Sequence, residues 1–378
     1  MFERVFKLSE HKTTVKTEVM AGITTFMTMA YILAVNPSVL GSTGMDTTAV
    51  LLATALASCL GTLCMAFMAN LPFALSAGMG LNAFMAYTVV AGYGYSWQVA
   101  LLAVFIEGLI FIVLSLTNIR EAIFNAIPLT LKKGVSVGIG LFIAFIGLQN
   151  SGLCVDSATL VGIISFPENF HTAGICALLT LIGLFFTAVF YTRKMKGAIL
   201  YGILLTWILG MLCQVTGLYV PTPDAGFYSL FPSWGMTDFS KLGLTFGQCF
   251  NVDFSAVGIV NFIVVIFSFL FVDIFDTLGT LIGVATKAKM LDKDGKLPGI
   301  KPALLADSIA TSAGAILGTS TTTTFVESAS GVAVGGRTGL TALVTGILFL
   351  VSTLFAPIFT AIPSFATAPA LIMVGFLM

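Results

Sequence analysis

Charged residues are scarce in this chain of 378 residues, at 9% of the total, whereas soluble domains carry about 25%. The 17 basic and 17 acidic residues balance, so no basic excess exists to neutralise the phosphates of a nucleic acid. Hydrophobic residues make up 57% of the chain, which excludes a disordered chain and a soluble enzyme with a wet surface. The composition therefore predicts an all-α, polytopic protein of the lipid bilayer.

Cysteine and histidine are also scarce, and neither forms a chemical motif. None of the six cysteines stands in a CxxC pair or another metal-site spacing. The two histidines, His11 and His171, lie outside the apolar runs and complete no catalytic set. The sequence therefore predicts no metal, no cofactor and no enzymatic activity.

Long apolar runs take up most of the chain, and a helix of about 20 such residues crosses a bilayer. No signal peptide precedes them, because the first 18 residues form a charged arm. The last run starts near Ala368 and ends with the chain at Met378, so we expect truncation inside span 12. The predicted spans are 19–40, 47–69, 75–91, 97–118, 134–149, 172–191, 195–217, 255–286, 303–318, 320–334, 338–357 and 368 onward.

The basic residues test this layout. If the N-terminus lies in the cytoplasm and the connections alternate between the two sides, every Lys and Arg except Lys241 is cytoplasmic. This asymmetry is the positive-inside pattern expected of a correct span count and orientation. We therefore expect a multi-pass protein of the cytoplasmic (inner) cell membrane with its N-terminus inside.

Two of the predicted spans are interrupted. The third contains SAGMGLN at 76–82, and the tenth contains TSTTTTFVES at 319–328; glycine pairs and threonine runs disfavour continuous helix. The two spans are seven apart, so the second copy is inverted relative to the first. Paired interrupted spans in inverted halves indicate a transporter's binding site. The simpler interpretation is two kinked helices that pack through small residues.

Five acidic residues fall inside predicted spans, with no basic residue expected at the same depth. A carboxylate in the membrane is costly and is functional by default. Acids without bases favour a proton- or cation-coupled site over an anion site. The five residues are Glu107, Asp273, Asp276, Asp307 and Glu327.

The spacing of Asp273 and Asp276 places both carboxylates on one helix face, and Thr277 extends that polar stripe. Two carboxylates this close can share a proton and titrate as a coupled pair. We expect Asp273 and Thr277 to bind substrate, and Asp273, Asp276 and Glu327 to couple protons. A mutually hydrogen-bonded structural pair of aspartates is the alternative.

Glu327 and Asn82 follow the two interruptions, where each can face a bound ligand. The carboxylate can accept N–H groups, whereas the amide of Asn82 can donate and accept or simply cap a helix. For Glu107 and Asp307 a structural role is at least as plausible as a ligand role, and Thr24 and Thr28 can serve as polar contacts between helices. Leu81, Val326 and Ser328 flank the candidate site residues.

At these motifs the sequence resembles the nucleobase–cation symporters (the nucleobase–ascorbate transporter family), specifically the AzgA-like branch of hypoxanthine, guanine and adenine permeases. The resemblance runs from about Phe2 to the last residue. The threonine run ending in ESASG is its most specific part. The motifs are AGITTFMTMAY at 21–31, AGMGLNAF at 77–84, FVDIFDT at 271–277 and the stretch 318–336.

The resemblance implies a uracil-permease-like fold of seven plus seven inverted helices, with short strands in spans 3 and 10 and substrate between two domains. By position, Asn82 matches the family's polar residue of span 3, Asp273 and Asp276 the acids of span 8, and Glu327 the acid of span 10. A homodimer is also common in this fold. The implied parts are a cytoplasmic arm at 1–18, a core domain at 19–118 and 255–357, a gate domain at 119–217 and 358–378, and an extracellular connection at 218–254.

These features predict a proton-coupled importer of purine nucleobases that works by alternating access, with no nucleic-acid partner. An anion carrier of the sulfate or bicarbonate type shares the architecture but needs a cationic site, whereas this one is acidic. An intramembrane aspartyl protease needs two aspartates on separate spans with a Gly-x-Gly-Asp motif, which is absent.

Overall fold

The computed structural model describes residues 2–117, 119, 128–157, 160–167, 169–222, 227–232, 235–253, 257–287, 289–292 and 297–377. Residues 120–127, which fall in the predicted first gate half, lie outside this set. The chain divides into two compact units. Unit 1 comprises Met1–Ser136 and Thr237–Ala356, and unit 2 comprises Val137–Met236 and Pro357–Met378.

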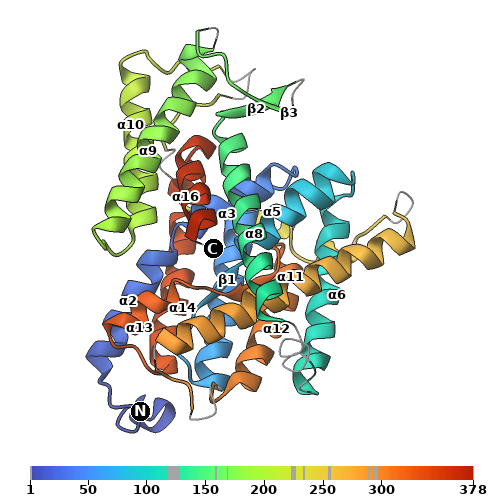
Figure 1. Ribbon diagram of the computed structural model, residues 1–378, viewed down its shortest axis with the longest axis vertical. Helices are drawn as coiled ribbons and strands as arrows, with labels where there is room; N and C mark the ends of the chain where they lie inside the picture. The colour runs from blue at the N-terminus through green and yellow to red at the C-terminus, as the bar shows by residue number, and fades with distance from the viewer. Residues whose placement is uncertain are drawn as a thin grey trace. The chain divides into compact units, whose positions relative to one another are not determined.

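Unit 1 is a helical bundle that contains one pair of very short strands (Figure 1). Its first segment runs through α1 (Phe2–Phe6), α2 (Val15–Met29), α3 (Ile32–Gly41), α4 (Thr47–Cys64), the π-helical turn η1 (Met65–Ala69), β1 (Leu75–Ala77), α5 (Met79–Ala83), the π-helix η2 (Phe84–Gly92) and α6 (Trp97–Leu116). Its second segment runs through the 3-10 turns η5 (Phe239–Leu244) and η6 (Gln248–Phe250), then α11 (Ile259–Lys287), α12 (Ile300–Leu317), β4 (Thr322–Thr324), α13 (Ser328–Val334), α14 (Gly339–Ser352) and the 3-10 turn η7 (Thr353–Phe355).

Unit 2 holds the remaining helices and a small hairpin. Helix α9 packs against α10 and α16, and α10 also packs against α16. Strands β2 and β3 pair antiparallel, with Cys154 opposite Ile163. The elements are α8 (Leu129–Asn150, which begins in unit 1), β2 (Cys154–Ser157), β3 (Leu160–Ile163), the π-helical turn η3 (Phe170–Gly174), α9 (Ile175–Thr192), α10 (Ala198–Val215), α15 (Ala356–Thr360, which begins in unit 1) and α16 (Ser364–Leu377).

Several helix boundaries differ from the predicted ones by a few residues, and the first and last helices show the reason. The first span begins at Val15 rather than near Val19, because the Thr14 hydroxyl accepts a hydrogen bond from the Thr17 N–H and caps α2 one turn earlier. The last helix begins at Ser364 rather than near Ala368. The residues at the start of these two helices, 15–18 and 364–367, are more polar than the apolar runs from which the spans were predicted.

The first predicted span is also two helices. Helix α2 ends at Met29, and α3 begins at Ile32 after a turn at Ala30 and Tyr31. No glycine or proline stands in this turn, so the sequence contained no local signal for the break. The break places Tyr31 at the junction of the two helices.

The predicted interruptions of the third and tenth spans are confirmed. Strand β1 replaces helix in the third and β4 in the tenth, and the two pair antiparallel, with Ser76 opposite Thr323. The Gly78 N–H donates to the Thr321 carbonyl over 2.9 Å, and the Phe325 N–H donates to the Ala74 carbonyl over 3.0 Å. These bonds extend the pairing beyond both ends of the strands, where no helix supplies partners for the backbone.

The packing of unit 1 repeats with inversion. Helix α2 packs against α14 and α13, whereas α11, seven spans later, packs against α6 and α5. Likewise α4 packs against α14, and α12 packs against α6. Each of these contacts therefore has a counterpart seven spans away, as the seven-plus-seven inverted repeat predicts.

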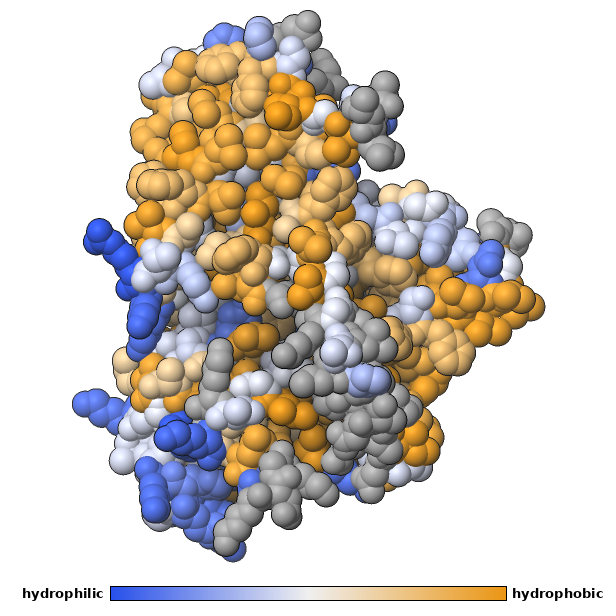
Figure 2. All heavy atoms as spheres, in the orientation of Figure 1, coloured by the Kyte–Doolittle hydropathy of each residue, from blue (hydrophilic) through white to orange (hydrophobic). Residues whose placement is uncertain are grey.

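Eight helices among the described residues are long and apolar enough to cross a membrane. Their outward side chains are apolar as well: in unit 2, Phe185 of α9 and Leu212 of α10 are exposed. Figure 2 shows apolar residues over the visible faces of these two helices. Exposed apolar faces of this kind fit a lipid environment.

Candidate functional site

The paired strands β1 and β4 and the side chains around them form the candidate site in unit 1. The Thr323 hydroxyl of β4 donates to Asp276 Oδ2 of α11 over 3.3 Å. A Cβ atom at Gly78 would lie 3.1 Å from Thr323 Oγ1 and 3.2 Å from Asp276 Oδ2. The absence of a side chain at Gly78 therefore keeps the space beside the Asp276 carboxylate open.

Glu327 brings a second carboxylate to this region. It immediately precedes α13, as the sequence predicts, and makes no side-chain capping bond to that helix. Instead, the Tyr31 hydroxyl donates to Glu327 Oε1 over 2.8 Å. Asp276 lies close enough to interact electrostatically with both Glu327 and Tyr31. Two acids from different spans thus converge beside the strands.

The five predicted intramembrane acids separate by exposure. Asp276 and Glu327 are half-buried. Asp273, Asp307 and Glu107 are fully buried. Asp276 and Glu327 are therefore the two of these acids that keep some accessible surface for a ligand.

Asp273 and Asp307 are brought together by Thr277. The Thr277 hydroxyl lies 2.8 Å from Asp273 Oδ1 and 3.1 Å from Asp307 Oδ1, and all three side chains are fully buried. A hydroxyl carries one proton and can donate to one carboxylate oxygen well. The sequence had left Asp307 alone in its span, whereas the fold joins it to the predicted pair on α11.

Asn82 contacts the loop that leads into β4. Its side-chain oxygen accepts a hydrogen bond from the Ser320 hydroxyl, and Gly78 is the residue that caps α5. The buried Nδ2 atom of Asn82 has no hydrogen-bond partner within the described part of the chain. This free amide donor can serve a ligand or a water molecule.

Glu107 and the neighbouring residues named from the sequence have mainly structural contacts. The Thr321 hydroxyl donates to Glu107 Oε2 over 2.8 Å, which ties α6 to the strand region. Ser328 accepts from the Ala74 N–H over 3.0 Å. The Thr24 hydroxyl donates to the Met20 carbonyl of its own helix. Leu81 is fully buried beside Gly78, and Val326 is 53% exposed.

Glu18 is fully buried, like Asp273, Asp307 and Glu107, and the sequence had placed it in the charged arm. In the structure it lies in the first turn of α2. Its oxygens accept the N–H groups of Arg337, Thr338 and Thr341 over 2.9, 3.3 and 3.2 Å. These contacts tie α2 to the start of α14, away from Glu327.

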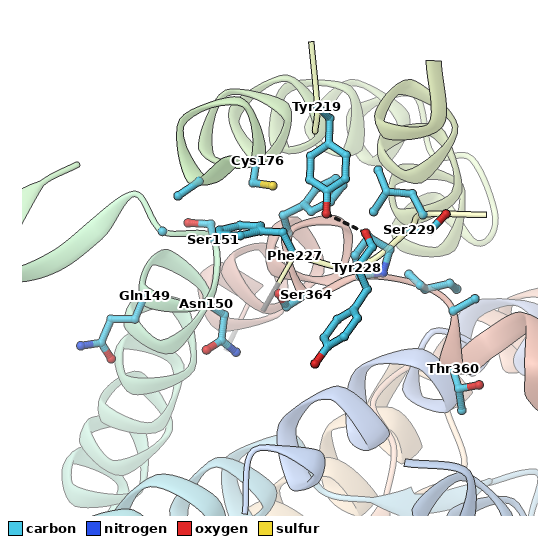
Figure 3. A pocket seen from close by; sticks show the side chains of 17 residues that line it. Gln149, Asn150, Ser151, Cys176, Tyr219, Phe227, Tyr228, Ser229, Thr360 and Ser364 are labelled. Atoms are coloured by element: carbon cyan, nitrogen blue, oxygen red, sulfur yellow. Dashed lines mark hydrogen bonds between the residues drawn. The ribbon is translucent and has the colours of Figure 1, made fainter. Parts of the chain in front are cut away.

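A cavity of about 570 Å³ lies in unit 2, and none of these residues lines it. Figure 3 shows it between the end of α8, the segment with Tyr219 and Tyr228, and the start of α16. The Tyr219 hydroxyl donates to the Tyr228 carbonyl at its edge over 2.8 Å. No carboxylate lines this cavity, so it is not the candidate site. The described residues also contain no cluster of His, Cys, Asp or Glu that could hold a metal ion.

The fold is that of inverted-repeat membrane transporters. The chain superimposes on the transmembrane domain of BicA, a cyanobacterial bicarbonate transporter, with a TM-score of 0.66 over 95% of this chain and 87% of that chain, at 16% identity. It also superimposes on the murine anion transporter Slc26a9 with a TM-score of 0.59 over 95% and 59% of the two chains, at 12% identity. At such identities the likeness establishes the seven-plus-seven fold alone.

The family follows from the sequence comparisons. The model of the permease family Xan_ur_permease matches residues 16–378, and the chain belongs to this family. It is 47% identical to the guanine/hypoxanthine permease PbuG of Bacillus subtilis over 99% of this chain and 82% of that one. It is 43% identical to the adenine permease AdeP of Escherichia coli over 100% and 80% of the two chains. The chain is therefore a multi-pass membrane transporter rather than an enzyme, which excludes the aspartyl protease.

Proposed function

We propose that this protein imports purine nucleobases by proton symport, and that the purine binds beside the paired strands of unit 1. The relatives are named for guanine, hypoxanthine and adenine. The observation that carries the proposal is the convergence of two half-buried carboxylates: Asp276 lies beside Gly78, and Glu327 is close enough to Asp276 to interact with it electrostatically. Purines present ring and exocyclic N–H groups, for which carboxylates are strong acceptors.

We divide the roles by burial and by unused hydrogen-bonding capacity. Asp276 and Glu327, which are half-buried, accept purine N–H groups. Asn82 is fully buried, but its Nδ2 atom has no partner within the described residues, so we assign it as a donor to a ring nitrogen or oxo group. Asp273 is fully buried and bonded to Thr277. We therefore assign it to the proton, and we place Thr277 beside it rather than on the substrate. Protonation of Asp273 lowers the local negative charge and links substrate affinity to pH.

Transport needs a change of access as well as a site. We assign unit 1 to the core domain that carries substrate and unit 2 to the gate domain, which move relative to each other in alternating access. The proposed orientation has the N-terminus in the cytoplasm and the protein in the cytoplasmic membrane, because all basic residues but Lys241 then lie inside.

An anion carrier is the second candidate, because both solved relatives in fold are named for bicarbonate or anions. The acids argue against it: Asp276 and Glu327 would repel an anion at the place where the strands meet. Among the described residues no lysine or arginine makes an ion pair with either acid. The purine proposal therefore fits the site better.

Counterflow in proteoliposomes separates the two candidates. Vesicles loaded with unlabelled hypoxanthine should transiently accumulate labelled hypoxanthine, and vesicles loaded with sulfate or bicarbonate should not. An acidic exterior should accelerate net uptake, and a protonophore should abolish that acceleration. Exchange of sulfate or bicarbonate without any exchange of purine would refute the proposal.

A further inference from the structure

Tyr31 is the largest fully buried side chain in the described part of the chain, and its hydroxyl ends at the candidate site. The residue occupies the turn between α2 and α3. Its hydroxyl donates to Glu327 Oε1 over 2.8 Å, across 296 residues of sequence. Nothing in the composition of the first span indicates a role for this hydroxyl, because tyrosine is common in apolar helices.

A second contact, made by Thr28 of α2, holds the segment that contains Glu327. Thr28 lies three residues before Tyr31, and its hydroxyl lies 2.9 Å from the Ser330 hydroxyl of α13. The Ser330 hydroxyl in turn donates to the Glu327 carbonyl. The main chain of Glu327 is therefore held through Thr28, while its carboxylate is held by Tyr31. This double attachment fixes the direction in which the carboxylate points.

The hydrogen bond from Tyr31 also occupies one oxygen of the Glu327 carboxylate. Within the described residues Tyr31 is the one side chain that donates to this carboxylate, and α13 provides no capping bond to it. Asp276 on α11 is the other acidic group near Glu327, whereas α2 presents the neutral residues Thr25 and Thr28 toward α13.

We propose that Tyr31 is a positioning residue for purine binding: it holds the Glu327 carboxylate oriented, with one oxygen occupied and the other available to a substrate N–H. The inference rests on the proposed function, because it assumes that Glu327 accepts from the purine. A preoriented acceptor loses less freedom when the substrate binds. Tyr31 therefore acts on substrate affinity through Glu327, not on the rate at which the loaded protein changes access.

The test compares Tyr31→Phe with wild type in hypoxanthine uptake by proteoliposomes over a range of pH. Phenylalanine keeps the ring and removes the hydroxyl, so packing is preserved. Loss of one charge-assisted hydrogen bond should raise KM about 5- to 30-fold at neutral pH, with Vmax within about twofold. The pH dependence of KM should also differ from that of wild type, because Glu327 has lost its one side-chain donor among the described residues.

Tyr219→Phe is the matched control, because it removes a tyrosine hydroxyl that donates over the same 2.8 Å in unit 2. It should leave KM and its pH profile unchanged. Elution as a single folded species and an unchanged melting temperature check that both variants fold. If wild type transports purine and Tyr31→Phe has the KM and pH profile of the control, the role of Tyr31 is refuted. If wild type transports no purine, the proposed function itself fails.

Discussion

Asp273 and Asp276 lie three residues apart on α11, yet their carboxylates make different contacts. Asp273 accepts from Thr277, which also reaches Asp307 on α12, whereas Asp276 accepts from Thr323 on β4. Asp273 is fully buried and Asp276 is half-buried. Two neighbouring acids of one helix can therefore serve different steps of transport.

Replacing each aspartate by asparagine should separate these steps. Asp276→Asn removes a charged acceptor from the site and should raise KM for hypoxanthine at least tenfold, which corresponds to about 1.4 kcal/mol. Asp273→Asn should abolish proton-driven uptake while counterflow persists, because exchange requires no net proton movement. Uptake and counterflow in proteoliposomes measure both effects. Proton-dependent uptake that is unchanged in Asp273→Asn would remove Asp273 from the mechanism.

Gly78→Ala should impair binding without unfolding the protein. The φ of −67° and ψ of 124° at Gly78 suit any residue, so glycine is needed there for space. The added methyl group would lie within 3.3 Å of Thr323, Asp276 and Leu81, and should raise KM about tenfold or more. Gly279→Ala, on α11 with nothing within 4 Å, is the control that should transport normally. Equal KM values for the two variants would show that Gly78 does not border the site.

The sequence predicted the two interruptions and proposed the candidate residues, but it did not predict the contacts that these residues make. The glycines at 78 and 80 and the threonine run disclosed both interruptions, because these residues disfavour helix locally. The pairing of Tyr31 with Glu327 was not predictable, since it depends on packing between halves of the chain. Glu18 was assigned to the arm because lysines and threonines surround it, and only the cap at Thr14 shows that the helix already includes it.

Glu18→Gln tests the structural role of that buried acid. An amide offers one acceptor oxygen where the carboxylate accepts three N–H groups and the Thr341 hydroxyl, the last over 2.6 Å. The variant should lose about 2–3 kcal/mol of stability, seen as a lower melting temperature in detergent. Glu10→Gln, whose carboxylate is exposed, should melt like wild type. An unchanged melting temperature in Glu18→Gln would contradict the importance of these bonds.

The ion pair of Lys241 with Asp46 should give a small, pH-dependent stabilisation. Burial acts to raise the pKa of Asp46, but hydrogen bonds from Ala49, Lys241 and Thr48 outweigh it and hold that pKa below its ordinary value of 3.8. A carboxyl with a lowered native pKa stabilises the fold above 3.8, and this contribution is lost as the pH falls through the native pKa.

Lys241→Met should therefore lower stability at pH 7 by less than about 1 kcal/mol, because Lys241 is 40% exposed. The difference from wild type should shrink below pH 4, where Asp46 becomes protonated in both proteins. Melting temperatures of both proteins at pH 7 and below pH 4 measure this difference. Lys7→Met, which breaks the more exposed pair with Glu10, should have no measurable effect. A difference that grows on acidification would contradict this account.

Binding of hypoxanthine to the purified protein tests the central claim most directly, because it isolates the site from transport. Equilibrium binding at neutral pH should be saturable in wild type and in the surface variant Asp238→Asn. It should weaken at least tenfold in both Asp276→Asn and Glu327→Gln. Binding in these two variants with the affinity of wild type would contradict the placement of the purine beside the paired strands.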